Sequence, residues 1–201
     1  QMNCKVNKTC GTHVHHDVTD VMIKSKETVK KFLNTLIKTV VKYEHIIYRL
    51  IAPSRLKKIG SGYWTKPARL IFGLDRFYQN EMTILNLKNI WTRGSVEFRY
   101  HQGTLNFEKL WSWIVFTQAF VTVSKENDRV NFSKVQDGKG GLFHLRKAIG
   151  FIGSKDRCEE VKSANKVIVS RFEELNTAAM NISRRSTKYY YTIKEQLKKG
   201  I

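Results

Sequence analysis

The chain has 201 residues, of which 41% are hydrophobic, 11% aromatic and 26% charged, and it contains two prolines. This composition excludes disorder along the whole chain and suffices for one domain with a hydrophobic core, or for a core with a helical appendage. No segment approaches the roughly 18 uninterrupted apolar residues of a membrane-spanning helix, so we expect a soluble protein.

The chain is strongly basic, with 36 Lys and Arg against 17 Asp and Glu and a formal net charge of +19. Such a charge suggests nucleic acid, a phosphate-bearing ligand or a membrane surface as partner, but basic residues spread along the chain also fit solvated helix faces. The cysteines Cys4, Cys10 and Cys158 lack metal-finger spacing and no secretory leader opens the chain, so a cytoplasmic location is expected.

An alternating segment near the start of the chain predicts a short strand. Over residues 10–18, a period of two places three ionisable side chains on one face, namely His13, His15 and Asp17. His16 points to the other face, and we interpret it as structural.

A long amphipathic helix is predicted to follow this strand. Apolar residues at i, i+3 and i+4 begin after Ser25, a plausible N-cap, and Pro53 closes the pattern. Residues 53–77 have the glycine and proline content of a loop.

A second alternating segment, residues 95–101, predicts another strand. Its polar face is expected to carry Glu97, Arg99 and His101. Residues 85–90 are expected to pair with it as an antiparallel neighbour.

Helices are predicted for most of the remaining chain. Asn106 is expected to cap a second long helix, and residues 137–141 read as a flexible connection. Short helices are expected at 142–149 and 161–175, before a basic tail. Three large aromatic residues of the second long helix are interpreted as core: Trp111, Trp113 and Phe116.

The two polar strand faces carry groups that can bind a metal ion and an anion. On an extended strand, His13 and His15 project about 6 to 7 Å apart, so they can share a metal or bind a metal and an anion side by side. Glu97 offers a hard oxygen ligand and Arg99 a planar fork for a carboxylate or phosphate. The structural alternatives are a hydrogen-bonded strand edge for the histidines and a cross-strand salt bridge for Glu97 and Arg99.

Three motifs occur in a fixed order: Cys-Gly-Thr-His-Val-His at residues 10–15, Arg-Gly-Ser-Val-Glu-Phe-Arg at 93–99, and Gly-Thr-Leu-Asn at 103–106. Together they resemble the amidoligase family, which is related in fold to glutamine synthetase and glutamate–cysteine ligase. The resemblance covers roughly residues 7–123. It implies an α+β fold with an incomplete antiparallel curved sheet packed by helices. The expected organisation is a catalytic core at 1–125, a helical extension at 126–176 and a basic tail at 177–201.

The resemblance implies an ATP-dependent ligase that joins a carboxylate to an amine through an acyl phosphate, with Mg2+ or Mn2+ as cofactor. By position, His13 and Glu97 resemble metal ligands and His15 resembles a contact to the nucleotide phosphates. Glu97 and Arg99 are the expected catalytic residues, and Arg99 resembles the arginine that receives the substrate carboxylate. Arg55 resembles an arginine that contacts phosphate or substrate, with a surface arginine as the alternative.

Some positions match the family less well. Arg76, Tyr78 and Asn86 lie where the family often has an aromatic residue and an asparagine, with a role that could be architectural. The Glu-x-Glu strand that opens the family's domain does not occur in these 201 residues. Because Mg2+ prefers oxygen ligands, two histidines and one glutamate alone make a poor site for it. We therefore expect these residues to be the C-terminal portion of an amidoligase, whose missing strand is supplied by an upstream segment or a partner chain. The chain by itself can then be inactive.

Two other functions stay open. A catalytically dead basic module would bind nucleic acid or another polyanion through the long helix and the tail, with affinity that falls steeply with salt. A zinc hydrolase would use His13, His15 and Asp17, although Asp17 would lie about 13 Å from His13 along an extended strand.

Overall fold

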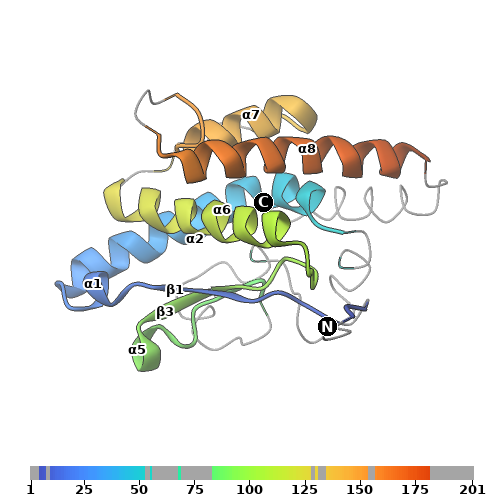
Figure 1. Cartoon of the computed structure of the whole chain (residues 1–201). Helices are drawn as coiled ribbons and strands as arrows, with labels where there is room; N and C mark the ends of the chain where they lie inside the picture. The colour runs from blue at the N-terminus through green and yellow to red at the C-terminus, as the bar shows by residue number, and fades with distance from the viewer. Residues whose placement is uncertain are drawn as a thin grey trace.

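The computed structural model describes residues 5–7, 10–52, 55, 68, 83–127, 130, 135–153 and 157–181. In this part of the chain a small antiparallel sheet is packed by helices (Figure 1), so the expected mixture of helices and antiparallel strands is confirmed. The elements are β1 (Val14–Asp17), α1 (Thr19–Met22), α2 (Lys26–Ile47), the 3-10 turn η1 (Tyr48–Leu50), β2 (Leu85–Asn86), α5 (Ile90–Arg93), β3 (Ser95–Phe98), α6 (Phe107–Glu126), α7 (Gly138–Ala148) and α8 (Glu159–Asn181).

The sheet has the strand order β1-β3-β2, with β3 in the centre. On one side of β3, His15 of β1 lies opposite Glu97, and on the other side Asn86 of β2 lies opposite the same residue. The pairing with the first strand extends past β1, because Gly11 forms an isolated bridge with Gln102. The predicted antiparallel neighbours are therefore confirmed, although β2 is limited to two residues.

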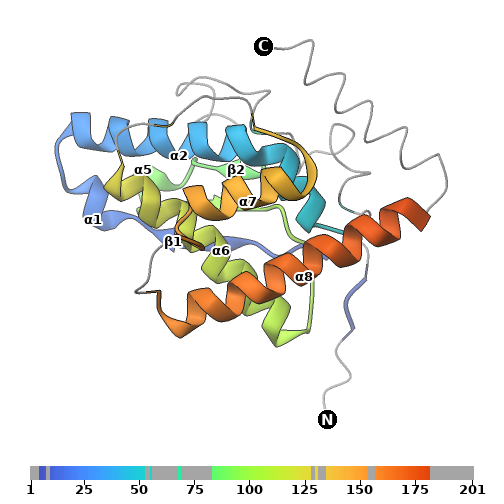
Figure 2. The same ribbon diagram turned by 90° about the horizontal axis from the view of Figure 1, so that it is seen from above.

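One face of the sheet is apolar and packs against α2 and α6, and α8 lies across α6 on the far side (Figure 2). Val96 and Phe98 of β3 are fully buried in this core. His16 lies on the same face, with Nε2 2.8 Å from Oγ1 of Thr117 on α6. Burial lowers the pKa of His16 to about 4, so its imidazole is neutral at neutral pH and its predicted structural role is confirmed.

The two long helices begin where the sequence predicts, because each has a side-chain cap. Ser25 accepts a hydrogen bond from the amide of Thr28 at the start of α2, and Asn106 accepts one from the amide of Lys109 at the start of α6. Among the helices of the described residues, none combines the length and apolarity needed to cross a membrane.

The expectation that His101 shares the polar face with Glu97 is wrong. Strand β3 ends at Phe98, so the alternation of faces is lost and both Tyr100 and His101 are buried. The His101 ring lies 5.0 Å from the ring of Trp113 on α6, on the helical side of the sheet. Burial lowers the pKa of His101 to about 4.

Two predictions in the helical part are also wrong. Trp111 is 41% exposed and stacks on Phe107 at the surface of α6, whereas Trp113 and Phe116 are core residues as predicted. The segment 137–141 begins α7, because the side chain of Asp137 accepts a hydrogen bond from the amide of Gly138 and caps the helix.

The C-terminal helices are longer than their periodicity predicts. Helix α8 has 23 residues, and its end at Asn181 lies beyond residue 176, the expected end of the helical extension. Residues 182–201 of the expected basic tail lie outside the described residues, as do Arg76 and Tyr78.

Candidate functional site

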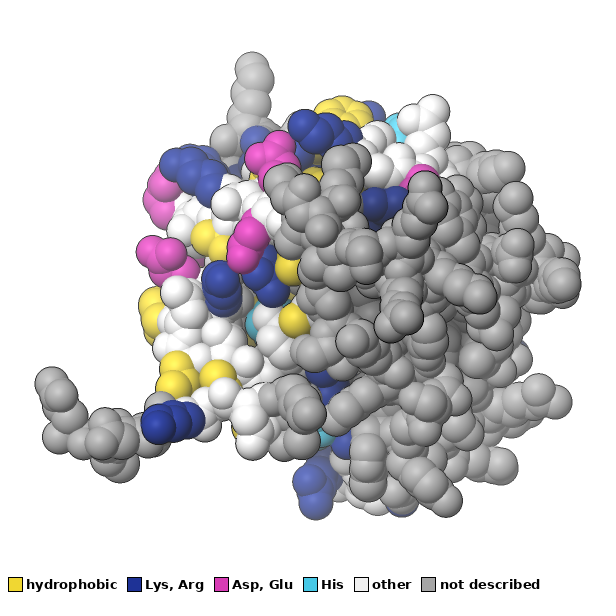
Figure 3. Space-filling model, turned by 90° about the vertical axis from the view of Figure 1, so that its right-hand side faces the viewer, with side chains coloured by type: hydrophobic (Ala, Val, Ile, Leu, Met, Phe, Trp, Pro, Cys, Tyr) yellow, Lys and Arg dark blue, Asp and Glu magenta, His cyan; other side chains and the backbone are white. Residues whose placement is uncertain are grey.

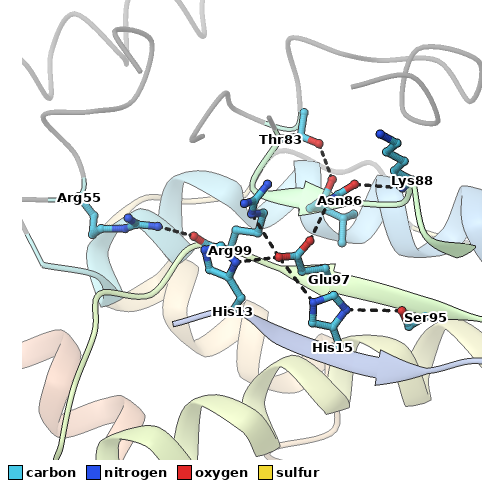
Figure 4. A network of polar contacts seen from close by, with 10 residues as sticks. His13, His15, Arg55, Thr83, Asn86, Lys88, Ser95, Glu97 and Arg99 are labelled. Carbon is cyan, nitrogen blue, oxygen red and sulfur yellow. Dashed lines mark hydrogen bonds and ion pairs between the residues drawn. The ribbon is translucent and has the colours of Figure 1, made fainter. Parts of the chain in front are cut away.

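The polar face of the sheet brings four predicted site residues together. His15 of β1 is paired with Glu97 of β3, and the residues that flank these strands, His13 before β1 and Arg99 after β3, also contact the Glu97 carboxylate. Figure 4 shows the imidazoles and the guanidinium directed toward the Glu97 carboxylate. Two segments about 80 residues apart in the sequence therefore supply one cluster.

Glu97 is the centre of this cluster. Its Oε1 lies 2.9 Å from Nδ1 of His13, 3.2 Å from Nε of Arg99 and 3.7 Å from Nε2 of His15. Its Oε2 accepts a hydrogen bond of 2.8 Å from Nδ2 of Asn86. The Glu97 side chain is only 7% exposed, so these four side chains replace most of its contact with water.

These partners keep the Glu97 carboxylate ionised. Burial by itself would raise the pKa of Glu97, but the hydrogen bond to His13, the charge of Arg99 and the hydrogen bond from Asn86 outweigh it and lower the pKa below its ordinary value. An ionised carboxylate can only accept hydrogen bonds, so Nδ1 of His13 is the donor in its bond to Glu97. Nε2 of His13 is then the nitrogen that can accept a proton.

Asn86 takes part in the site directly, beyond the architectural role that the sequence suggests. Its side-chain oxygen accepts a hydrogen bond of 3.0 Å from the amide of Lys88, which turns the NH2 group toward Glu97. The side chain is buried, although β2 is an edge strand of the sheet. The sequence does carry a signal for this position of Asn86, which is a single polar residue between Leu85 and Leu87. In a short strand this pattern makes one face apolar and places the polar residue on the other face.

The two imidazoles form the accessible edge of the cluster. The side chains of His13 and His15 are 38% and 42% exposed. Asp17, at the end of β1, is engaged elsewhere, because its Oδ1 accepts a hydrogen bond of 2.8 Å from the amide of Thr19. Asp17 therefore caps a turn, and this arrangement does not support a zinc hydrolase built on these three residues.

The described residues do not complete a magnesium site. Among them, no group of three or more His, Cys, Asp or Glu side chains is arranged to hold a metal ion. Glu97 is the one carboxylate of the cluster, and its Oε1 already faces the guanidinium of Arg99. An oxygen-rich shell for Mg2+ or Mn2+ is not available from His13, His15 and Glu97 alone.

Arg55 lies behind the cluster and is 6% exposed, so the alternative of a surface arginine is wrong. Its Nη2 donates a hydrogen bond of 2.7 Å to the backbone carbonyl of Arg99. Burial and, to a lesser extent, the nearby charge of Arg99 lower the pKa of Arg55. The structure thus joins Arg55 to the site through the backbone of Arg99.

Basic side chains do not gather into one patch on the described part of the surface seen in Figure 3, where Lys and Arg are interspersed with Asp and Glu. Several of them form ion pairs within or onto α8, such as Lys162 with Glu159 and Arg171 with Glu174. This mixture is typical of a solvated helix face.

Comparison of the chain with protein-family models, with curated proteins and with solved structures found no significant match.

Proposed function

We propose that the chain is an ATP-dependent carboxylate–amine ligase of the amidoligase type, built on a sheet of the glutamine-synthetase-like kind. The observation that supports this proposal is the convergence of His13, His15 and Arg99 on the ionised carboxylate of Glu97. The resemblance implies these residues at one site. The strand register sets His15 opposite Glu97, and His13 and Arg99 contact the same carboxylate from just outside the two strands.

In the first step, the substrate carboxylate attacks the terminal phosphorus of ATP, the bond to the ADP oxygen breaks, and an acyl phosphate forms. Arg99 binds the substrate carboxylate, because its planar guanidinium can donate two parallel hydrogen bonds. Glu97 holds this guanidinium in place through Nε. The accessible imidazole of His15 donates a hydrogen bond to a phosphate oxygen.

In the second step, the amine attacks the acyl carbon, inorganic phosphate leaves, and the amine loses a proton. Glu97 is a weak base because its pKa is lowered. His13 is better placed to take this proton, since its Nδ1–H donates to Glu97 and leaves Nε2 as the acceptor. One carboxylate, one amine and one ATP thus give one amide, ADP, phosphate and a proton.

The experiment that tests this proposal replaces the unknown amine with hydroxylamine. The purified chain is incubated with ATP, MgCl2 or MnCl2, hydroxylamine and a panel of amino-acid and dicarboxylic acid carboxylates. An acyl phosphate reacts with hydroxylamine to a hydroxamate, which forms a coloured iron(III) complex. We expect hydroxamate and ADP in equal amounts with at least one carboxylate, and no hydroxamate without ATP.

Two variants show whether the cluster is responsible. Glu97→Gln is expected to abolish hydroxamate formation, whereas Glu108→Gln, an exposed Glu at the start of α6, is expected to leave it unchanged. If no carboxylate yields hydroxamate or carboxylate-dependent ADP, the ligase proposal is refuted for this chain by itself.

A further inference from the structure

Arg55 is a buried cation without a counter-ion among the described residues. It is 6% exposed, and none of the ion pairs formed within the described part of the chain includes it. Its Nε also has no hydrogen-bond partner in the described part of the chain. A buried charge is costly unless it is paired, so the presence of Arg55 at this position needs a specific reason.

The hydrogen bonds around Arg55 lie just beyond the paired residues of β1 and β3. Its Nη2 donates to the carbonyl of Arg99, the first residue after β3. Three residues earlier, the amide of Ala52 donates to the side-chain oxygen of Gln102, which forms the bridge with Gly11. The segment around Arg55 is therefore attached twice to the chain that continues from β3.

Gly11, on the partner segment, provides the space for the guanidinium. A Cβ atom at Gly11 would lie 3.1 Å from Nη1 and 3.2 Å from Nη2 of Arg55, which is closer than ordinary van der Waals contact. The Gly11 backbone therefore lies against the guanidinium, and any larger residue must displace it. Arg55 thus contacts both segments of the site at once, one through a hydrogen bond and one through close packing.

From this geometry we infer that Arg55 is a positioning residue, which holds Arg99 and the segment that leads to His13 in their places, and that Gly11 is required to accommodate it. Regular pairing between β1 and β3 ends at Val14 and Phe98, so His13 and Arg99 both lie outside the ladder. A rigid guanidinium packed across the two segments restricts both side chains. Arg55 then acts through Arg99, which differs from the direct contact to phosphate or substrate that the resemblance implies.

The inference rests on the proposed function only in assigning Arg99 to the substrate carboxylate. The position of Arg99 can be tested without any activity, so the first measurement is structural. In two-dimensional NMR spectra of the full chain, the Nε–Hε signal of Arg99 is assigned by its loss in Arg99→Lys. We expect this signal to shift in Arg55→Gln and in Gly11→Val. The double variant should show the same shift as either single variant, because both substitutions disrupt the same contact between Arg55 and the site. Arg146→Gln is the matched control, since Arg146 contacts Asn165 away from the site, and should leave the signal unchanged.

The second measurement uses the hydroxamate assay. We expect Arg55→Gln and Gly11→Val to raise the KM for the carboxylate about tenfold or more and to leave the KM for ATP unchanged, because a displaced Arg99 misplaces only the carboxylate. A raised KM for ATP with an unshifted Arg99 signal would overturn the inference and make Arg55 a direct phosphate contact. An unshifted Arg99 signal in both variants would also overturn it.

Milder substitutions keep the test valid if these variants do not fold. Gly11→Ala requires the guanidinium to move by only a few tenths of an ångström, so it should give a smaller shift of the same Arg99 signal. Arg55→Lys keeps the charge but not the fork and should also shift it. If the unaltered chain forms no hydroxamate, the proposed function fails while the NMR comparison still decides the role of Arg55.

Discussion

Replacing Glu97 with glutamine tests whether the carboxylate at the centre of the site organises its neighbours. The substitution keeps the shape but removes the charge, and it changes one oxygen into an NH2 donor. If the amide oxygen faces His13 and Arg99, the new NH2 meets the NH2 of Asn86, which is a donor against a donor. In the opposite orientation, the NH2 meets His13 and Arg99.

Either orientation of the glutamine loses at least one hydrogen bond to a charged acceptor, worth about 1.5 to 3 kcal/mol, and leaves the charge of Arg99 without its carboxylate. Because Glu97 and Arg99 are only 7% and 11% exposed, water compensates little of this loss. We expect the free energy of unfolding to fall by about 3 kcal/mol at pH 7. With an m-value of about 2 kcal/mol/M, the midpoint of urea unfolding should fall by about 1.5 M.

The pH dependence of this difference follows from the lowered pKa of Glu97. A carboxyl group whose pKa is lower in the folded than in the unfolded state stabilises the fold above its unfolded pKa, close to 4.5, and this contribution is lost as the pH falls through the folded pKa. The difference between the original chain and Glu97→Gln should therefore be constant from pH 7 to about 5 and shrink below 4.5. Urea unfolding followed by tryptophan fluorescence measures it.

The matched control is Glu108→Gln, an exposed glutamate, which should change stability by less than about 0.5 kcal/mol. A Glu97→Gln variant as stable as this control at pH 7 would refute the reasoning. So would a difference that grows as the pH falls.

Further changes test the neighbours of Glu97 and the buried histidines. Asn86→Asp places a second carboxylate beside Oε2 of Glu97, so we expect urea unfolding at pH 7 to show a loss of about 2 kcal/mol or more; a neutral substitution would contradict the contact. Arg99→Lys should raise the KM for the carboxylate about tenfold in the hydroxamate assay, because an ammonium cannot reproduce the bidentate fork, and an unchanged KM would remove Arg99 from the substrate site. His16 and His101 have pKa values lowered from 6.5 to about 4, so the unfolded chain takes up protons first and stability falls as the pH drops below 6.5. The contribution of each to this slope rises toward about 1.4 kcal/mol per pH unit as the pH falls below 6.5. His101→Phe should therefore reduce the slope of stability against pH between 6.5 and 5 by about 1 kcal/mol per pH unit, and a slope equal to that of the original chain would disprove this.

The polar face of the sheet could be predicted from the sequence because it depends on local periodicity. In an extended segment, alternate side chains must point to the same side, so His13 and His15 share a face, and so do Glu97 and Arg99. The same rule failed for His101. Strand β3 ends at Phe98, and the alternation extends one residue further, to Arg99, but not to His101. No local signal marks that end.

The starts of the long helices were also predictable, because Ser25 and Asn106 cap their own helices through residues three positions away. Trp111 shows where such reasoning stops. Periodicity defines which residues lie on one side of α6, but the neighbours of that helix decide how wide a stripe is covered. Trp111 lies outside the covered stripe and stacks on Phe107.

The sequence by itself determined which side chains can face one another, because strand and helix periods are properties of the local backbone. Only the tertiary structure decided which of them do. Asn86 meets Glu97 through the pairing of separate strands, and Arg55 reaches the carbonyl of Arg99 from 44 residues away. Such contacts depend on how distant segments pack, and burial then sets the charge and the hydrogen-bonding role of each group. For this reason the cluster around Glu97 could be expected from two motifs, while the contacts by which Asn86 and Arg55 hold it in place could not.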